Sequence, residues 1–460
     1  MTHPTGGAPL YEALQALAAR DTARFHMPGH KGKPVFDAFA GVFPIDFTET
    51  YGTGNLYEGT GPIRAAEARA AALYKAADCH FLTGGSTQGV HAMLYAACGA
   101  GGVLALDRSA HKSALSACAL FDLAPHFVYP EPAEPFGFRA HLAPDEVDEM
   151  LRARPDIRAL LVVSPNYYGV RQDLPALAAV CHKHGRLLLV DAAHGAHFPA
   201  LGLPSPIEEG ADAAVLSAHK TLPALGQGAY LLFADTMDGA RLREGAAMVG
   251  TSSPSYPVMA SLDLARVWLE GAGGEAYRTA ALESRHLRDT IAAHTPFLPV
   301  TPYDFPDLDL CRLTVCTAAT TLTGHALADA LFVRHEVACE MADDRNVVFI
   351  LSGVDSPFDL LRLRRALASE GKRTKRVPLP APVPPLPAPE RVVTVRQAWF
   401  SAHENVPLAH AAGRICARAI TPYPPGIPLL WPGEKITAAH IEFLLQRCYT
   451  ENEQISVICL

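Results

Sequence analysis

Two short apolar runs, each ending in a chemically reactive side chain, constrain this chain more than any other feature. Residues 186–190 have the length and apolarity of a buried strand, and they end at Asp191. Residues 213–216 form a second such run, which leads within four residues to Lys220. A lysine this close to a buried strand has just left the core, where desolvation lowers an amine pKa and favours Schiff-base chemistry. A solvated lysine at a strand exit is the alternative.

A βαβ unit places the first of these strands in a parallel sheet. Residues 160–164 read as a strand and residues 173–184 as a helix that Gly185 stops, and the strand ending at Asp191 follows. Right-handed crossover makes the two strands of such a unit parallel. We therefore expect an α/β fold with ligands at the carboxyl ends of the strands.

An aspartate and a lysine at successive strand ends suit one cofactor in particular. Pyridoxal phosphate needs a lysine amine for its aldehyde and a carboxylate to keep its ring nitrogen protonated. Lys220 and Asp191 can supply these two groups. The pair therefore predicts a pyridoxal-phosphate site at this edge of the sheet.

A glycine-rich turn after another short strand, residues 79–82, is a candidate phosphate cradle. Gly85, Ser86 and Thr87 open an Ala- and Leu-rich helix. Glycine lets the backbone approach an anion, hydroxyls donate to it, and the helix N-terminus favours negative charge. An ordinary capped helix start is the alternative. The lysine downstream favours the cradle.

Further motifs along the chain carry a resemblance. The sequence Ser217–Thr221, preceded by Asp191–His197, resembles the Orn/Lys/Arg decarboxylases of the aspartate-aminotransferase fold. Other segments similar to that family appear in the family's order: Arg24–Gly32, Gly61–Ile63, Asp107–Ser113, Gly250–Pro257 and Thr421–Pro428. Two positions depart from it, because relatives usually carry Glu where this chain has Ala192, and paired acids near Asn55.

The resemblance implies roles for several residues. It gives His111 the part of an aromatic ring stacked on the cofactor, and places His194 against the ring or the substrate. It also implies that the Thr251–Ser253 loop reaches the phosphate of a neighbouring subunit, and that the loop at residues 25–32 approaches an active site. We predict Lys220, Asp191 and His111 as catalytic residues. The predicted cofactor-binding residues are these three with Gly85, Ser86, Thr87, His194, Ser217, His219, Thr251 and Ser252.

Composition excludes some function classes. The net charge of 39 − 47 = −8 argues against a nucleic-acid-binding surface. We find neither a secretory signal nor an apolar run of the ~18 residues that a membrane span needs. The cysteines are scattered without a Cys-x-x-Cys pair, and His26 with His30 lacks a third ligand, so we expect no metal. Buried thiols and the absence of a signal suggest the cytoplasm.

The predicted organisation is a large α/β domain with a mainly parallel sheet, followed by a smaller α+β domain. The boundaries we expect are an N-terminal arm and helix at 1–50, the cofactor-binding domain at 51–280, and the small domain at 281–460. A stiff proline-rich linker spans 377–389. Beyond it, between Arg391 and about Leu430, we expect a strand followed by a helix at 408–420.

The predicted activity is removal of the α-carboxylate of a basic amino acid by a pyridoxal-phosphate enzyme. Arginine, lysine or ornithine would give agmatine, cadaverine or putrescine, which are polyamines or their precursors, and we favour arginine as the substrate. The predicted assembly is a homodimer, or an oligomer of dimers, with shared active sites. One rival is an aminotransferase or carbon–sulfur lyase of the same fold. Another is an inactive cofactor-binding regulator, which the presence of both Lys220 and Asp191 disfavours.

Overall fold

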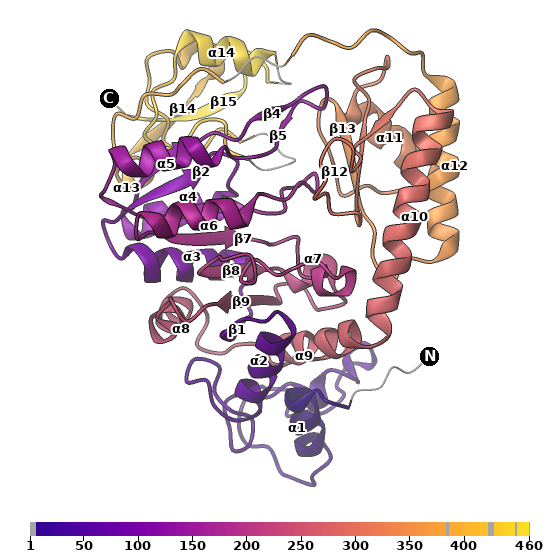
Figure 1. The fold of residues 1–460 in the computed structure, drawn as a ribbon. Coiled ribbons are helices and arrows are strands. Elements are labelled where there is room, and N and C mark those ends of the chain that lie inside the picture. The colour runs from indigo at the N-terminus through magenta and orange to yellow at the C-terminus, as the bar shows by residue number, and fades with distance from the viewer. Residues whose placement is uncertain (1–5, 383–385, 422–426, 447–448, 460) are drawn as a thin grey trace. The chain divides into compact units, whose positions relative to one another are not determined.

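The computed structural model of the chain describes residues 6–382, 386–421, 427–446 and 449–459 (Figure 1). The chain folds into two compact units, and each is assembled from separate stretches of sequence. The first unit comprises residues 1–97, 174–282 and 351–355. The second unit comprises residues 98–173, 283–350 and 356–460.

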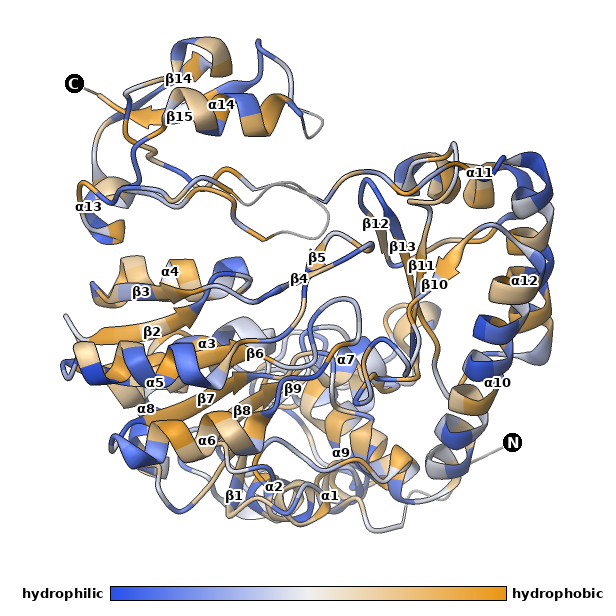
Figure 2. Cartoon of the chain, turned by 45° about the horizontal axis from the view of Figure 1, so that its top comes forward, coloured by the Kyte–Doolittle hydropathy of each residue, from blue (hydrophilic) through white to orange (hydrophobic). Residues whose placement is uncertain are grey.

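The first unit contains four neighbouring strands in the order β1-β9-β8-β7. β7 and β8 are parallel, whereas β9 runs antiparallel to both β8 and β1. These strands are short and almost wholly buried, and Figure 2 shows β7 and β8 largely in the orange of hydrophobic residues. Their bounds are Asp78–Leu82 (β1), Leu187–Asp191 (β7), Ala213–Leu216 (β8) and Ala229–Phe233 (β9).

Helices of the first unit begin where the sequence provides helix-start signals. Pro9 and Pro62 each occupy the first turn of a helix, where the missing N–H costs no hydrogen bond. Asp263 accepts the N–H of Leu10 at 2.9 Å and so caps the first helix from another element. The helices are α1 (Pro9–Ala18), α2 (Gly61–Leu73), α3 (Gly85–Cys98), α6 (Leu174–Lys183), α7 (Ala218–Thr221), α8 (Gly239–Met248), α9 (Tyr256–Glu270) and the start of α10 (Ala272–His294).

The second unit contains a parallel set of strands and smaller antiparallel sheets. The parallel set has the order β6-β2-β3, and a four-stranded antiparallel sheet has the order β10-β11-β13-β12. The remaining pairs are β4 with β5 and β14 with β15. The bounds are Val103–Asp107 (β2), Ala124–Val128 (β3), Pro132–Ala133 (β4), Phe138–Arg139 (β5), Ile157–Val163 (β6), Leu298–Pro299 (β10), Arg312–Cys316 (β11), Met341–Ala342 (β12), Asn346–Ile350 (β13), His403–Pro407 (β14) and Gln454–Ile458 (β15).

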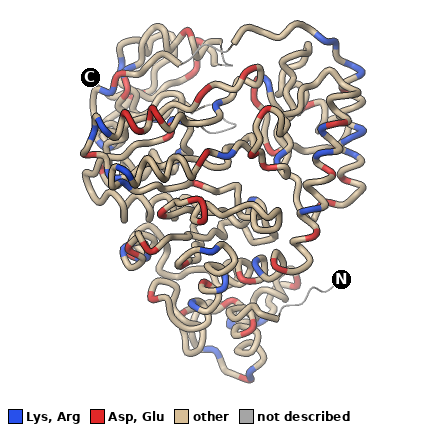
Figure 3. Tube along the Cα trace, viewed as in Figure 1, with Lys and Arg blue, Asp and Glu red and all other residues tan. Residues whose placement is uncertain are grey.

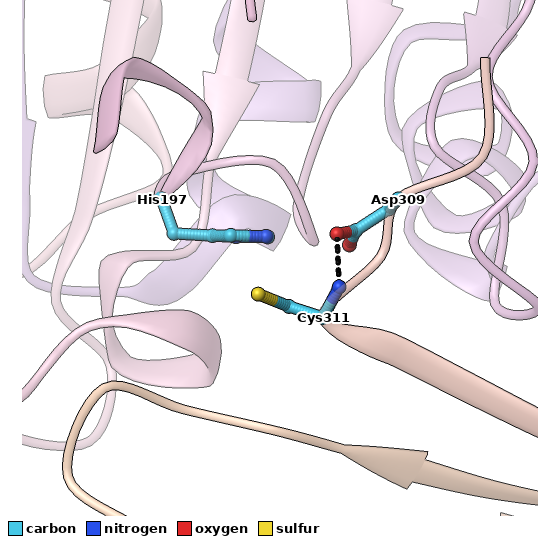
Figure 4. A group of neighbouring side chains, drawn as sticks. All are labelled: His197, Asp309 and Cys311. Carbon is cyan, nitrogen blue, oxygen red and sulfur yellow. Dashed lines mark hydrogen bonds between the residues drawn. The ribbon is translucent and has the colours of Figure 1, made fainter. Parts of the chain in front are cut away.

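The long helix α12 of this unit is amphipathic. α12 shows the pattern well, because Leu363, Ala366 and Leu367 are buried while its arginines face outward, and Figure 3 shows the helix lined with basic residues. Ser356 begins it with a capping box to Asp359. The helices are α4 (Lys112–Phe121), α5 (Pro144–Ala153), α11 (Gly324–His335), α12 (Pro357–Arg373), α13 (Val395–Phe400) and α14 (Ala438–Leu445).

After the linker, the expected strand is present as β14, which ends at Pro407, but the helix expected at 408–420 is wrong. Arg391 makes a single bridge to Glu434, and the helix that follows is α13. Residues 408–420 form one 3₁₀ turn and then pair with other segments, as in the bridge between Cys416 and Val457. Gly413 adopts φ +81°, which ends any helical path there. Apolar residues in this segment therefore serve a small irregular core rather than one face of a helix.

The predicted fold class is confirmed in the strands: the parallel pairs carry the large sheet, and antiparallel pairs build the smaller sheets. The three predicted domain ranges stay a prediction. Residues 383–385 of the predicted linker and 422–426 of the motif at 421–428 lie outside the described residues. The cysteines that the structure describes are thiols, and seven of them are buried, as expected. Within the described ranges, every helix is too short or too polar to cross a bilayer.

Candidate active site

Lys220 stands in the short helix α7, directly after the buried strand β8. Its side chain is partly buried, and its Nζ lies 3.3 Å from His194 Nε2. His219, the residue before Lys220 in this helix, fixes the helix in place. Its backbone N–H and ring Nδ1 contact the Gly228 carbonyl oxygen at 3.2 and 3.0 Å. The Lys220 amine therefore lies just beyond the carboxyl end of β8, and the contacts with Gly228 hold helix α7 in place.

Asp191 ends β7 and is buried. One carboxylate oxygen accepts the N–H of Ala193 at 3.2 Å. Burial raises the pKa of Asp191, and the charge of Lys220 acts in the opposite direction. A carboxylate in this position gains from a cation placed beside it, such as a protonated ring nitrogen.

The sheet register brings these two groups to one edge. β7 and β8 are parallel, with Asp191 opposite Val215, and the N–H of Ala192 donates to the Val215 carbonyl oxygen at 2.9 Å. The loops that carry Asp191, His194 and Lys220 therefore leave the sheet together. An acid and an amine lie at this edge, as the strand-end argument predicted, and the His194 imidazole lies beside the amine.

The predicted phosphate cradle lies at the same edge. Gly85 opens α3 with φ +70°, and a side chain there would meet nothing within 4 Å, so the helix start is open. Ser86 is partly buried and Thr87 exposed. Gly89, one turn later, packs so closely on β8 that a Cβ would lie 2.5 Å from Val215 Cγ2. Close packing thus sets the positive end of α3 beside the end of β8.

One tight turn ties the cradle to the lysine helix. The N–H of Gly85 donates to the Gln227 carbonyl oxygen at 2.8 Å, while the next carbonyl, that of Gly228, accepts from His219. Consecutive residues of one turn therefore hold both loops. A phosphate on α3 and an aldehyde at Lys220 would be anchored to a common backbone segment.

Buried hydroxyls without partners test whether pyridoxal phosphate fits. Ser217 Oγ, Thr83 Oγ1 and Thr221 Oγ1 are buried and make no hydrogen bond within the described residues. Unsatisfied buried donors are rare in folded proteins. They follow the ends of β1 and β8, beside the open start of α3, so an anion bound there has donors available. With Lys220 and Asp191, the residues present fit the cofactor.

Gln88 belongs to this site, and sequence reasoning missed it. Its Oε1 accepts the N–H of Gly84 at 2.9 Å, and its Nε2 donates to the Ala246 carbonyl oxygen at 2.7 Å and to Tyr57 Oη at 3.3 Å. Gln88 thus holds the first turn of the cradle in place. The available signal was a glutamine four residues after a glycine at a helix start, which is too common to select this residue.

The predicted roles of three further site residues, Thr251, Ser252 and His111, stay predictions. Thr251 and Ser252 are exposed after α8, and Thr251 Oγ1 accepts the N–H of Ser253 at 3.2 Å. His111 belongs to the second unit, where its Nδ1 accepts the N–H of Ser113 at 3.2 Å and so caps α4. The cofactor contacts expected of these residues remain predictions.

Solved structures with the same fold define the class. A lysine decarboxylase of Francisella novicida aligns with a TM-score of 0.83 at 18% identity, covering 99% of this chain and 82% of that one. An L-threonine transaldolase of Pseudomonas fluorescens aligns with a TM-score of 0.56 at 15% identity, covering 81% and 82%. These likenesses show the fold, and a lysine with a buried aspartate at neighbouring strand ends suits a pyridoxal-phosphate site.

The family follows from sequence. Residues 8–306 match the major domain of the Orn/Lys/Arg decarboxylases, and residues 386–454 match the C-terminal domain of the same family. An uncharacterized protein of Bacillus subtilis, YaaO, is 34% identical over 455 residues, covering 95% of this chain and 93% of that one. An arginine decarboxylase of B. subtilis is 30% identical over 458 residues, covering 95% and 93%. The chain belongs to the Orn/Lys/Arg decarboxylase family.

Family membership confirms the coarser predictions. The family, the enzyme class and pyridoxal phosphate as cofactor are as the sequence predicted. The chain is thus a decarboxylase of the basic amino acid group, with a small-molecule amino acid as substrate. The family match does not by itself specify which basic amino acid is the substrate.

Proposed function

We propose that this enzyme decarboxylates arginine to agmatine, with lysine and ornithine as the next candidates. The observation that carries the chemistry is the meeting of Lys220, His194 and Asp191 at one strand edge. Support for arginine comes from relatives: the proteins named arginine decarboxylase are 29–30% identical across nearly the whole chain, whereas those named lysine decarboxylase are 23–27% identical.

Each residue of the site has a task in this proposal. Pyridoxal phosphate, when bound, supplies an aldehyde and a ring that takes up electrons as the carboxylate leaves. Lys220 holds the cofactor through its amine, and Asp191 holds a proton on the ring nitrogen. Ser86, Thr87 and Ser217, with His219 beside them, bind the phosphate. The stacking of His111 on the ring is part of the same proposal.

Loss of carbon dioxide leaves Cα in need of a proton. The Lys220 amine and the His194 ring can both carry a proton at this edge, and their nitrogens are 3.3 Å apart. A proton delivered by either one can be replaced from the other. Lys220 and His194 are therefore the proposed donors.

We further propose a homodimer with shared active sites in the cytoplasm. The N-terminal segment leaves large apolar side chains uncovered: Phe25 is 93% exposed, Phe36 63% and Phe39 51%. Exposed apolar patches of this kind mark association surfaces. The exposed hydroxyls at Thr251 and Ser252 suit contact with a partner subunit's cofactor phosphate. Buried thiols suit a reducing compartment.

A panel of amino acids tests the activity. Purified enzyme is incubated with arginine, lysine, ornithine and several neutral and acidic amino acids, and carbon dioxide and amine products are both measured. Arginine should give carbon dioxide and agmatine in equal amounts. A keto acid without carbon dioxide would favour the aminotransferase alternative, and thiol release from a sulfur amino acid would favour the lyase.

A mixing experiment tests the shared site. Lys220→Ala is combined with a chain that carries Thr251→Ala and Ser252→Ala, each of them inactive alone. Hybrid dimers should recover part of the activity, because one of their two sites has all its residues. If the chains exchange but no activity returns, each site is built from one chain.

A further inference from the structure

The C-terminal domain of this family, residues 386–454, contacts the strand-to-helix loop that carries His111. The contact is a buried ion pair between Arg108, just after β2, and Glu434 of the C-terminal domain. The ion pair is bidentate, because Nη1 and Nη2 of Arg108 donate to the two carboxylate oxygens of Glu434, each at 2.9 Å. The exposed fractions of the two side chains are 8% and 2%.

Further contacts hold both partners of this pair rigidly. Arg108 Nη2 also donates to the Leu429 carbonyl oxygen at 2.6 Å, and its guanidinium lies 4.2 Å from the centre of the Phe127 ring. Glu434 Oε2 accepts the N–H of Trp431 at 2.7 Å. An ion pair with this many fixed contacts has one orientation, so it can position the backbone to which Arg108 belongs.

That backbone leads directly to His111. The N–H of Arg108 donates to the Val128 carbonyl oxygen at 2.9 Å, which anchors the loop to β3. Asp107 then accepts the N–H of Ser109 at 2.7 Å, and the N–H of Ala110 donates to the Asp107 carbonyl oxygen at 2.9 Å. Backbone hydrogen bonds thus hold Arg108, Ser109 and Ala110 in place, and the C-terminal domain holds the side chain of Arg108.

The same domain also holds the far end of α4. Arg396, in α13, donates to the carbonyl oxygens of Ala119 at 3.2 Å and Leu120 at 2.7 Å. This contact satisfies carbonyls that a helix end leaves without partners. It lies at the opposite end of the helix from His111, so it provides a matched control for the pair at the start.

We propose that Glu434, acting through Arg108, is a positioning residue of the active site. Its carboxylate fixes the β2–α4 loop, and with it the backbone that carries His111. The C-terminal domain then takes part in catalysis without touching substrate. This inference rests on the proposed role of His111 beside the cofactor.

The test compares Glu434→Gln, which keeps the shape and removes the charge, with Arg396→Met. Hydrogen exchange of the amides of residues 109–113 is measured in the cofactor-free protein. Visible circular dichroism of bound pyridoxal phosphate and kcat are then measured in the loaded enzyme. Glu434→Gln should speed loop exchange at least tenfold, change the cofactor signal and lower kcat about tenfold. Arg396→Met should leave all three unchanged.

A second variant distinguishes a loss of loop positioning from a general loss of stability. Glu434→Asp keeps the charge and should fall between wild type and Glu434→Gln in loop exchange and in kcat. If both variants lower the unfolding temperature but leave loop exchange and the cofactor signal as in wild type, the pair is only structural and the inference is wrong.

The failure of this inference can be told apart from that of the proposed function. If His111→Ala leaves the cofactor signal unchanged while wild type still releases carbon dioxide from arginine, the loop does not serve the cofactor and only the inference fails. If wild type releases no carbon dioxide from any basic amino acid, the proposed function fails. Loop exchange and the cofactor signal of Glu434→Gln need no substrate, so they decide the inference in either case.

Discussion

The strand edge of the first unit and the C-terminal domain of the second each bury a carboxylate, and they do so differently. Asp191 accepts a backbone N–H, and burial raises its pKa. Glu434 is matched on both oxygens by Arg108 and receives the N–H of Trp431 as well. Burying an ionised group is costly unless it is paired and hydrogen-bonded. The first region is therefore built to receive a ligand, and the second is complete without one.

The largest effect is expected at the lysine of the ligand-receiving region. Lys220→Ala should lower kcat by at least ~10³-fold, because no other amine replaces the covalent anchor. In wild type, borohydride should fix the cofactor on a peptide that contains residue 220. Lys183→Ala, a change to an exposed lysine in the same unit, should behave as wild type. A label on Lys31 or Lys112 would overturn the assignment.

The second effect separates a functional aspartate from a structural one. Asp191→Asn should bind cofactor yet lose about 10²-fold or more in kcat, because the ring nitrogen loses its counter-ion. The matched variant Asp263→Asn should keep kcat and lose about 2 kcal/mol of stability, since Asp263 pairs with buried Arg266 and caps α1. Steady-state kinetics and urea unfolding measure both.

Asp191 also carries a prediction about pH. Burial raises the folded-state pKa of this acid, so its ionisation costs stability as pH rises above the unfolded-state value. Cofactor-free Asp191→Asn should therefore be at least as stable as cofactor-free wild type at pH 7. A clear loss of stability would show that Asp191 holds the fold together and would weaken the comparison with Glu434.

The third effect probes how completely the C-terminal domain is packed. Gly433 adopts φ +89°, and a Cβ there would lie 2.3 Å from the Val393 carbonyl oxygen. Gly413 adopts φ +81° but a Cβ would meet nothing within 4 Å. Gly433→Ala should cost roughly 2–4 kcal/mol and Gly413→Ala about 1 kcal/mol. Equal costs, measured by urea unfolding, would mean that backbone strain alone decides both.

The smallest effect concerns another buried carboxylate, Glu67, whose Oε2 lies 3.1 Å from Nη2 of Arg243. Burial raises its pKa from 4.5 to about 7, against the attraction of Arg243. Between these values the folded state binds more protons, so stability should fall as pH rises, by at most ~1.4 kcal/mol per pH unit, and level off above about 7.

Glu67→Gln should remove this slope. Unfolding free energies of wild type and variant are measured from pH 5 to pH 8. Parallel curves for the two proteins would place the pKa of Glu67 near its ordinary value and make it a satisfied ion pair like Glu434.

The features that could be predicted from the sequence are those that a local residue pattern determines. The strands ending at Asp191 and Lys220 were visible because short apolar runs with a polar end have few other interpretations. Gln88 and Glu434 were invisible as site residues because their roles depend on partners elsewhere in the chain, up to 326 residues away. The helix expected at 408–420 failed for a related reason, since apolar residues there pack into a core made by several separate segments.

The Arg108–Glu434 pair has a consequence for how the chain is made. At a synthesis rate of about 5–20 residues per second, Arg108 leaves the ribosome roughly 15–65 s before Glu434, which is 326 residues later. Through that time the guanidinium remains hydrated, and the β2–α4 loop lacks its anchor. The nascent chain can therefore assemble the strands that carry Asp191 and Lys220 well before this loop is set. A chain truncated shortly before residue 434 would retain the strands that carry Asp191 and Lys220 but would lack the carboxylate that pairs with Arg108.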